Sequence, residues 1–374
     1  MNPEDPPASP PQPFLTSIPP TSAQAAAAAE ARRYTRAFFD PLERGRPLPE
    51  GRALYTEPRD EQLGASYVYD PALVLAINVA LATGRPLLLA GEPGCGKTSV
   101  ARNIALHQRW DYFPHTMASR SQAQELLYEF DTLRRLNEAQ ARRRVRDEAH
   151  FVEPGALWWA LAPRSAARRG LPEGVRVKPA EPPPGLATSR IVPPIWPPPG
   201  YKPFASAVVL IDEIDKCEPD VPNDLLEVLD ARRFSVRGRP VVAEDVRDHV
   251  LVVITTNVER DLPGAFERRC VAYRFPDASP GWFATIGAQR WPDVPRATLD
   301  GLEERLRLHR QAARGRDERL PGTAEYLDAV AAVARLSLRD GSDATGLDAQ
   351  ALLDACVFGK QAQLAAAGSA GAAE

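Results

Sequence analysis

The stretch LLLAGEPGCGKTSV, residues 87–100, places three glycines, a proline and one lysine between a short apolar run and a predicted helix. The apolar run predicts a buried strand. Glycines after such a strand allow either a tight turn or a loop whose backbone N–H groups converge on an anion at the helix N-terminus. Because every fixed position of G-x-x-x-x-G-K-[ST] is present with the correct flanks, we favour a phosphate-binding loop.

This loop predicts ATP and Mg²⁺ as cofactors. Lys97 would place a point charge on the β- and γ-phosphates, and Thr98 would offer a hydroxyl to Mg²⁺. Cys95 is interpreted as an inert small residue; the alternative is a thiol whose oxidation blocks binding. The residues predicted to bind the nucleotide are Gly91, Glu92, Pro93, Gly94, Cys95, Gly96, Lys97, Thr98 and Ser99.

Two carboxylates follow a second apolar run, SAVVLIDEID, residues 206–215. An unbroken apolar run is typical of a strand that is covered on both faces. Acidic residues also end strands without a catalytic role, but here they lie downstream of a phosphate loop. We therefore assign Asp212 to Mg²⁺, together with Thr98, and Glu213 to the catalytic base.

A third apolar run, HVLVVITTN, ends at Asn257. If its strand lies beside the strand of Asp212, the Asn257 amide can orient the attacking water; otherwise it caps a turn. The segment LPGAFERRC (262–270) then predicts a surface helix carrying Arg268 and Arg269. These arginines cannot easily reach their own phosphate loop but could complete the site of a neighbouring subunit, an effect worth about 10³ to 10⁵ in rate elsewhere. The alternative is a solvated basic face.

Strands separated by helices predict an α/β fold with a parallel, doubly wound sheet, and the pattern after residue 277 predicts a small all-helical lid domain. Proline-rich stretches lack periodicity and predict a tail and an insertion, which would be either a partner-docking loop or a solvated linker. The predicted divisions are a disordered tail (1–22), a helical extension (23–64), the α/β domain (65–277, with an insertion at about 163–205), the helical lid (278–362) and a second tail (363–374).

The composition of the chain excludes few classes of function. The 374 residues carry a formal net charge of −3, which gives no sign of nucleic-acid binding, and the four cysteines lack metal-site spacing. No apolar run approaches the roughly 20 residues of a membrane span. We expect a cytoplasmic protein that binds neither membrane nor nucleic acid.

The motifs GEPGCGKT, VVLIDEID, ITTN and AFERRC, in that order, resemble the Walker A, Walker B, sensor 1 and arginine-finger elements of AAA+ ATPases. With the segments LLYEFDTLRRLNEAQ and FVEPGALWWAL, which look like a pore-facing helix-2 insert, the chain most resembles the MoxR-like (AAA_5-type) branch. The resemblance covers roughly residues 65–335, excluding the proline-rich insertion. It favours Arg269 as the finger, with Arg268 next to it.

The resemblance implies an ATP-hydrolysing ring homo-oligomer, a hexamer, that acts as a chaperone-like remodeller or activator. Its client would be a partner protein, in this branch often one with a von Willebrand factor A domain. One departure concerns the sensor 2 arginine, whose position is held here by Glu325 or, in another alignment, by Gln350.

Two other functions remain open at this stage. One is an ATP-gated assembly or signalling module of a defence-type operon, with little turnover. The other is a DNA-linked motor of the McrB kind, which would be stimulated by DNA with a strong salt dependence.

Overall fold

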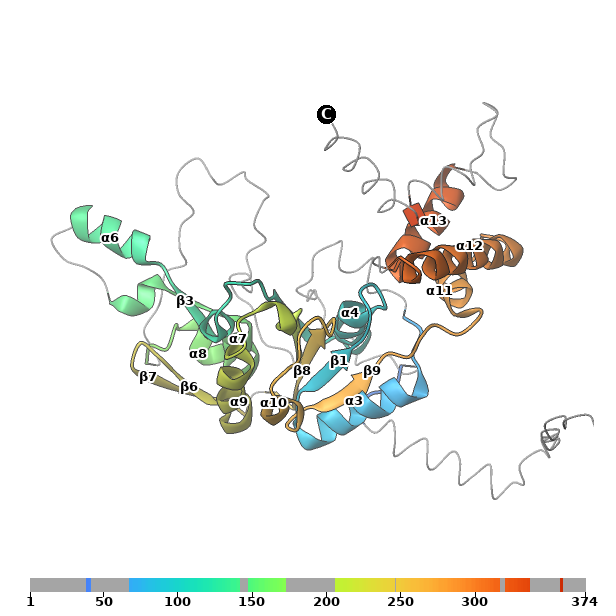
Figure 1. The fold of residues 1–374 in the computed structure, drawn as a ribbon. Coiled ribbons are helices and arrows are strands. Elements are labelled where there is room, and N and C mark those ends of the chain that lie inside the picture. Colours follow the sequence, from blue (N-terminus) through green and yellow to red (C-terminus); the bar gives the residue numbers. More distant parts are fainter. Residues whose placement is uncertain are drawn as a thin grey trace, which may run out of the picture.

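The computed structural model describes residues 38–41, 67–141, 147–172, 206–245, 247–316, 320–336 and 357–358. At its centre is a five-stranded sheet in the order β2-β5-β8-β1-β9, with every neighbouring pair parallel (Figure 1). The strands are β1 (Leu87–Ala90), β2 (Asp111–Thr116), β5 (Ser206–Asp212), β8 (His249–Thr256) and β9 (Val271–Arg274). The predicted parallel α/β sheet is confirmed.

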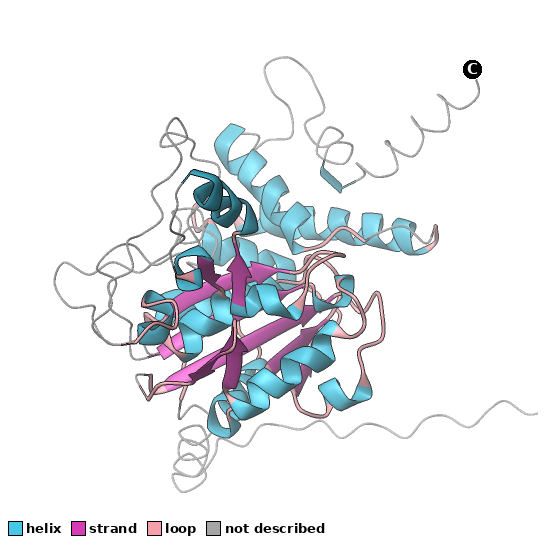
Figure 2. Ribbon diagram, turned by 90° about the vertical axis from the view of Figure 1, so that its left-hand side faces the viewer, coloured by secondary structure: helices cyan, strands magenta, loops and turns pink. Residues whose placement is uncertain are grey.

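Helices cover both faces of this sheet, as Figure 2 shows. Alternate strand residues point to opposite faces, so Leu87 and Leu89 join one core and Leu88 the other. The first core contains α3 (Pro71–Thr83) and α4 (Lys97–Gln108). The second contains α5 (Ala123–Leu127), α7 (Ala156–Leu161), α9 (Val221–Ala231) and the short α10 (Gly264–Glu267).

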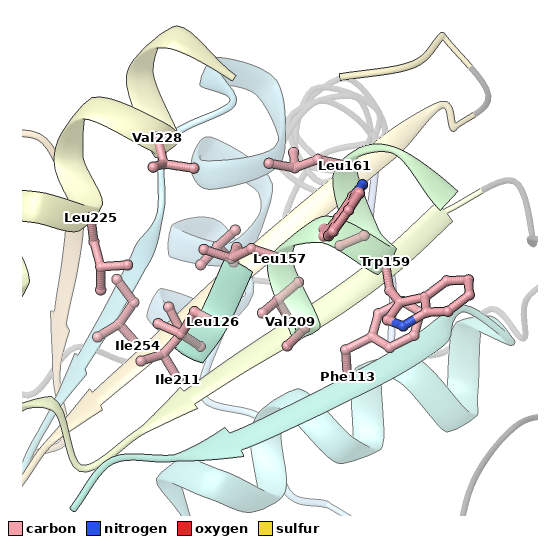
Figure 3. Packing of buried hydrophobic residues seen from close by; sticks show 14 of the residues in the cluster. Phe113, Leu126, Leu157, Trp159, Leu161, Val209, Ile211, Leu225, Val228 and Ile254 are labelled. Carbon is pink, nitrogen blue, oxygen red and sulfur yellow. The ribbon is translucent and has the colours of Figure 1, made fainter. Parts of the chain in front are cut away.

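The second core is built on α7. Figure 3 shows Leu157 and Trp159 directed from this helix toward strand residues such as Val209 and Phe113. The neighbouring Trp158 is fully buried. The two tryptophans therefore pack the core and do not present a surface for stacking on bases.

Two small hairpins extend from the domain on the side away from the C-terminal helices (Figure 1). One pairs β3 (Tyr128–Phe130) with β4 (Val152–Pro154), and the connection between them contains α6 (Thr132–Ala141) and a 3₁₀ turn (Glu148–Phe151). The other pairs β6 (Arg233–Val236) with β7 (Arg239–Val242). Arg237 bonds to Glu148 at 3.1 Å and Arg239 to Asp147 at 2.8 Å, which ties the hairpins together.

The predicted helical region follows β9 and is confirmed as α11 (Trp282–Arg290), α12 (Arg296–Arg314) and α13 (Thr323–Leu336). These helices bury their own core, which includes Leu299, Leu306 and Tyr326. The buried carboxylate of Glu303 accepts hydrogen bonds from the backbone of Gly281 and Ala284, at the start of α11. We refer to these three helices as the lid.

The structure differs from the sequence prediction at several elements. Strands β2 and β9 and both hairpins were not predicted, and the predicted strand 206–215 ends at Asp212 because Glu213 has a left-handed backbone (φ 61°). The predicted insertion at 163–205 begins instead with a helix, α8 (Pro163–Ala167). Its first N–H groups donate to the Glu244 carboxylate, which explains why the helix forms there. The predicted surface helix of the two arginines ends at Glu267, so Arg268 only caps it.

Several predictions lie outside the described residues. These are the tail 1–22, most of the extension 23–64, the insertion from residue 173 to 205, the lid beyond residue 336 except 357–358, and the tail 363–374. Among the described residues, no helix has both the length and the apolar character that crossing a membrane requires.

Candidate functional site

The loop after β1 runs from Gly91 to the start of α4 and lies at the carboxyl end of the sheet. Gly94 and Gly96 adopt positive φ angles of 80° and 99°, which L side chains rarely adopt. A Cβ on Gly91 would lie 3.0 Å from the Phe275 side chain and 3.1 Å from Cys95 Sγ. The glycines are thus required by the loop's shape, which leads the backbone to the N-terminus of α4.

Lys97 closes this loop on itself. Its ammonium group donates to the carbonyl oxygens of Gly91, at 2.8 Å, and of Glu92, at 2.9 Å, and the side chain is only 6% exposed. A buried ammonium held by two neutral carbonyls is well suited to exchange them for phosphate oxygens, because opposite charges attract more strongly in a partly buried site. The loop therefore fits a nucleotide phosphate chain.

Thr98, Asp212 and Thr255 form a hydrogen-bonded group beside the loop. The Thr98 hydroxyl lies 3.0 and 3.1 Å from the two carboxylate oxygens of Asp212. The Thr255 hydroxyl donates to Asp212 Oδ1 at 2.5 Å and accepts from the backbone N–H of Glu213 at 2.9 Å. A hydroxyl and a carboxylate this close fit Mg²⁺, which takes few protein ligands and completes its shell with water and phosphate.

Glu213 and Asn257 face each other from the ends of adjacent strands, β5 and β8. Asn257 Nδ2 lies 3.5 Å from Glu213 Oε1, while Glu213 Oε2 accepts from Lys216 at 2.7 Å. The hydrogen bond from Lys216 to Glu213 raises the pKa of that lysine above its ordinary value. The strand that precedes Asn257 thus lies beside the strand of Asp212, which is the condition under which the Asn257 amide can orient the attacking water.

Asp215 was missed by sequence reasoning. Its carboxylate is 4% exposed and accepts from the backbone N–H groups of Asn257, at 3.0 Å, and Glu259, at 3.1 Å. Asp215 thereby fixes the backbone that carries the Asn257 amide. The sequence did contain a signal for this role. Asp215 belongs to DEID, two residues after Glu213, and the ITTN motif lies on the neighbouring strand.

A cavity of about 670 Å³ brings most of these residues together. Of the loop residues predicted to bind nucleotide, Pro93 to Ser99 line it, whereas Gly91 and Glu92 do not. Lid residues that sequence reasoning did not identify form its opposite wall: Trp282, Ile286, Arg290, Trp291, Thr323, Ala324, Leu327, Asp328, Ala331 and Arg335. The α/β domain therefore supplies the phosphate loop and the carboxylates, while the lid supplies apolar side chains together with the charged Arg290, Asp328 and Arg335.

A second cavity, of about 370 Å³, lies on the other side of the tip of the loop. Aromatic side chains of both domains line it, together with Glu92 and Arg310. Tyr273 donates a hydrogen bond to Asp70 at 2.8 Å in its wall, and burial, the largest cause, raises the pKa of Tyr273 well above its ordinary value.

Besides Gly91 and Glu92, Arg268, Arg269 and Glu325 also do not line the main cavity. Arg269 pairs with Asp230 at 2.9 Å, both side chains being about half exposed. Glu325 is buried and accepts from the backbone N–H of Gly322 at 2.8 Å, so it caps α13. Gln350 is outside the described part of the chain.

Cys95 lies within the loop, 3.9 Å from the Lys97 ammonium. Burial, the largest cause, raises the pKa of its thiol, although the charge of Lys97 acts in the opposite direction. A raised pKa lowers the thiolate fraction, which favours the interpretation of Cys95 as an inert residue.

One comparison with known proteins agrees with this geometry. Residues 86–270 match the family described as AAA domain (dynein-related subfamily). A similar solved structure is that of a candidate ATPase from Cytophaga hutchinsonii, with 13% identity over 83% of this chain and 77% of that chain and a TM-score of 0.38. The search of curated proteins found no match. The matched family and the sheet support an AAA+ ATPase, and the solved structure adds no further argument.

Proposed function

We propose that this chain, which has the AAA+ P-loop fold, hydrolyses MgATP in a ring and uses the energy to remodel or activate a partner protein. The observation that carries the proposal is the convergence of Lys97, Asp212 and Glu213 on one cavity bounded by the lid. Each comes from the carboxyl end of the parallel sheet, where α/β folds bind ligands.

The proposed roles follow from the contacts. Lys97 exchanges its two carbonyl partners for phosphate oxygens of ATP, and the N–H groups at the start of α4 bind the same phosphates. Thr98 and Asp212 would hold Mg²⁺, which when bound neutralises charge on the phosphates. Glu213 accepts a proton from the attacking water, and Asn257 orients that water.

We propose that Arg269, or its neighbour Arg268, completes the site of the next subunit. Two observations support this. Neither arginine lines the chain's own cavity, and the Arg269 side chain is about half exposed, so it is available to another copy. An arginine supplied in trans requires a neighbouring copy at each site, and we propose that the copies form a closed hexameric ring.

We propose further that the chain is of the MoxR-like branch and that the α6-containing hairpin contacts the client, possible clients including proteins with a von Willebrand factor A domain. In support, α6 projects from the domain, and its Leu133 and Leu136 are 75% and 51% exposed. The second hairpin is ion-paired to the same segment through Arg237 and Arg239, so a shift of one hairpin is transmitted to the other.

Replacing Glu213 tests the catalytic proposal. Glu213→Gln keeps the shape of the side chain but removes the base, so MgATP binding is retained and turnover falls at least about 100-fold, the lower range for general base catalysis. Glu218→Gln, an exposed glutamate in the following turn, is the matched control and leaves turnover unchanged. Lys97→Ala abolishes binding. Wild-type turnover in Glu213→Gln would exclude this role.

One observation favours a second candidate, an ATP-gated module with little turnover. Glu325, at the position compared with sensor 2, is engaged in capping α13. The two candidates separate in steady-state hydrolysis measured against protein concentration. A composite interface site gives turnover per subunit that rises steeply as rings form, whereas a gate gives slow turnover that does not depend on concentration.

A further inference from the structure

The lid contacts the phosphate loop directly through a partly buried arginine. Arg310 of α12 donates from Nη2 to the Glu92 carboxylate at 2.6 Å and from Nη1 to the Pro321 carbonyl at 2.6 Å. Its side chain is 14% exposed. One guanidinium thus holds both the second residue of the loop GEPGCGKT and the segment that leads into α13.

The start of α13 rests on the same loop. The backbone N–H of Thr323 donates to the Gly94 carbonyl at 3.1 Å. A Cβ on Gly322 would lie 3.1 Å from the Pro93 carbonyl oxygen and 3.3 Å from that of Gly94, closer than most side chains tolerate. The lid therefore approaches the loop backbone as closely as a glycine permits, and Arg310 fixes this approach.

Glu92 connects this contact to the phosphate-binding lysine. The Glu92 carbonyl accepts from Lys97, and the Glu92 side chain accepts from Arg310. When phosphate oxygens take the place of the Lys97 partners, the backbone of Glu92 loses a hydrogen bond while its side chain stays attached to the lid. A change at the phosphates is thereby passed to α12 through a single residue.

We propose that Arg310 is a positioning residue for nucleotide binding, which couples the lid to the phosphate loop by holding Glu92. The inference rests on the proposed ATPase function. It accounts for lid coupling although Glu325, at the position compared with sensor 2, is engaged in capping α13. Since Lys97, Asp212 and Glu213 belong to the α/β domain, Arg310 governs how firmly the lid closes the cavity and not the chemical step.

The expected effect is therefore on KM and not on kcat. Charge-assisted hydrogen bonds are stronger than neutral ones, although Glu92 is 42% exposed and solvent weakens the pair. Arg310→Ala raises the Kd for MgADP and the KM for ATP about 5- to 30-fold, with kcat within about three-fold of wild type. Arg310→Lys, which keeps the charge but not the two-pronged geometry, gives a smaller increase.

The control variant comes from the same helix. Arg296→Ala removes an exposed arginine that pairs with Asp300 four residues along α12, and it leaves KM and kcat unchanged. Glu92→Gln removes the partner from the α/β side, so the result does not depend on how well the lid of Arg310→Ala folds. If the Arg310–Glu92 pair couples the lid to the phosphate loop, either substitution alone already breaks the coupling. The double variant Glu92→Gln, Arg310→Ala then binds MgADP no more weakly than the weaker-binding single variant.

Calorimetry with MgADP and steady-state kinetics on the full chain decide the outcome. Raised Kd in both single variants, non-additive in the double variant, supports the proposal. The proposal is overturned if the Kd of Arg310→Ala is unchanged, or if the increases in Kd of the two single variants combine in full in the double variant. Failure of the wild-type protein to bind MgADP would overturn the proposed function as well, so the two failures are distinguishable.

Discussion

Replacing Arg269 by alanine separates a catalytic role in trans from a structural one. The Arg269–Asp230 ion pair has a 2.9 Å contact between side chains that are 49% and 53% exposed. Pairs of this kind contribute at most about 1 kcal/mol to folding. The variant should therefore melt within a few degrees of wild type.

The effect on hydrolysis should be far larger. An arginine that stabilises the charge on a transferred phosphoryl group is worth about 10³ to 10⁵ in rate, which corresponds to about 4 to 7 kcal/mol. Such a loss cannot come from an exposed ion pair. Asp230→Asn tests this directly, because it breaks the same pair from the other side and should leave turnover unchanged. Arg268→Ala shows which of the two arginines acts.

A mixing assay tests the supply of the arginine by a neighbour. Arg269→Ala subunits keep Glu213, and Glu213→Gln subunits keep Arg269, so interfaces of mixed rings can carry both groups. In a random equal mixture roughly a quarter of the interfaces are intact, and turnover should recover to about that fraction of wild type. The reasoning is refuted if Arg269→Ala and Arg268→Ala both keep full turnover, if mixing restores nothing, or if Asp230→Asn loses as much activity as the arginine variant.

Two further predictions concern buried groups near the phosphate loop. Asp215→Asn removes a charged acceptor from the backbone N–H of Asn257, so turnover should fall about ten-fold while the Kd for MgADP is retained. The free energy of unfolding, measured by chemical denaturation, should fall by about 1 to 3 kcal/mol. Asp220→Asn, at an exposed site, is the control. Because burial raises the pKa of Cys95, iodoacetamide should alkylate it slowly at pH 7.5 and faster as pH rises above its ordinary pKa. Mass spectrometry of the Cys95 peptide measures this, and rapid labelling at pH 7 would contradict it.

The sequence predicted the parts of the fold whose physical requirements are local. The loop needs positive φ at Gly94 and Gly96, and the central strands β1, β5 and β8 need unbroken apolar runs because helices cover both of their faces. Both requirements are visible in a few residues. Adjacency of the strands that carry Asp212 and Asn257 stayed a condition at the level of sequence, and the pairing of β5 with β8 meets it.

The edge strands were missed for the opposite reason. Strand β2, DYFPHT, contains a proline and three polar residues and is buried only over its first half, while β9, VAYR, has four residues and alternates in exposure. Edge strands tolerate such residues because one side has no partner strand. Their pairing depends on β5 and β1, far away in the sequence, and no local pattern records it.

The lid wall of the cavity could not be predicted, and the reason bears on the function. A helical period shows which face of α11 or α13 is apolar, but not what that face meets after the connection at residues 275–281. Trp282 and Leu327 look like ordinary core residues in the sequence, yet they line the cavity opposite Lys97. The contacts that fix their position are the hydrogen bond of Thr323 to Gly94 and the pair of Arg310 with Glu92. Since both contacts end on the proposed phosphate loop, a ligand that reshapes this loop would also act on the lid, and under the proposed function the movement of the lid would originate there.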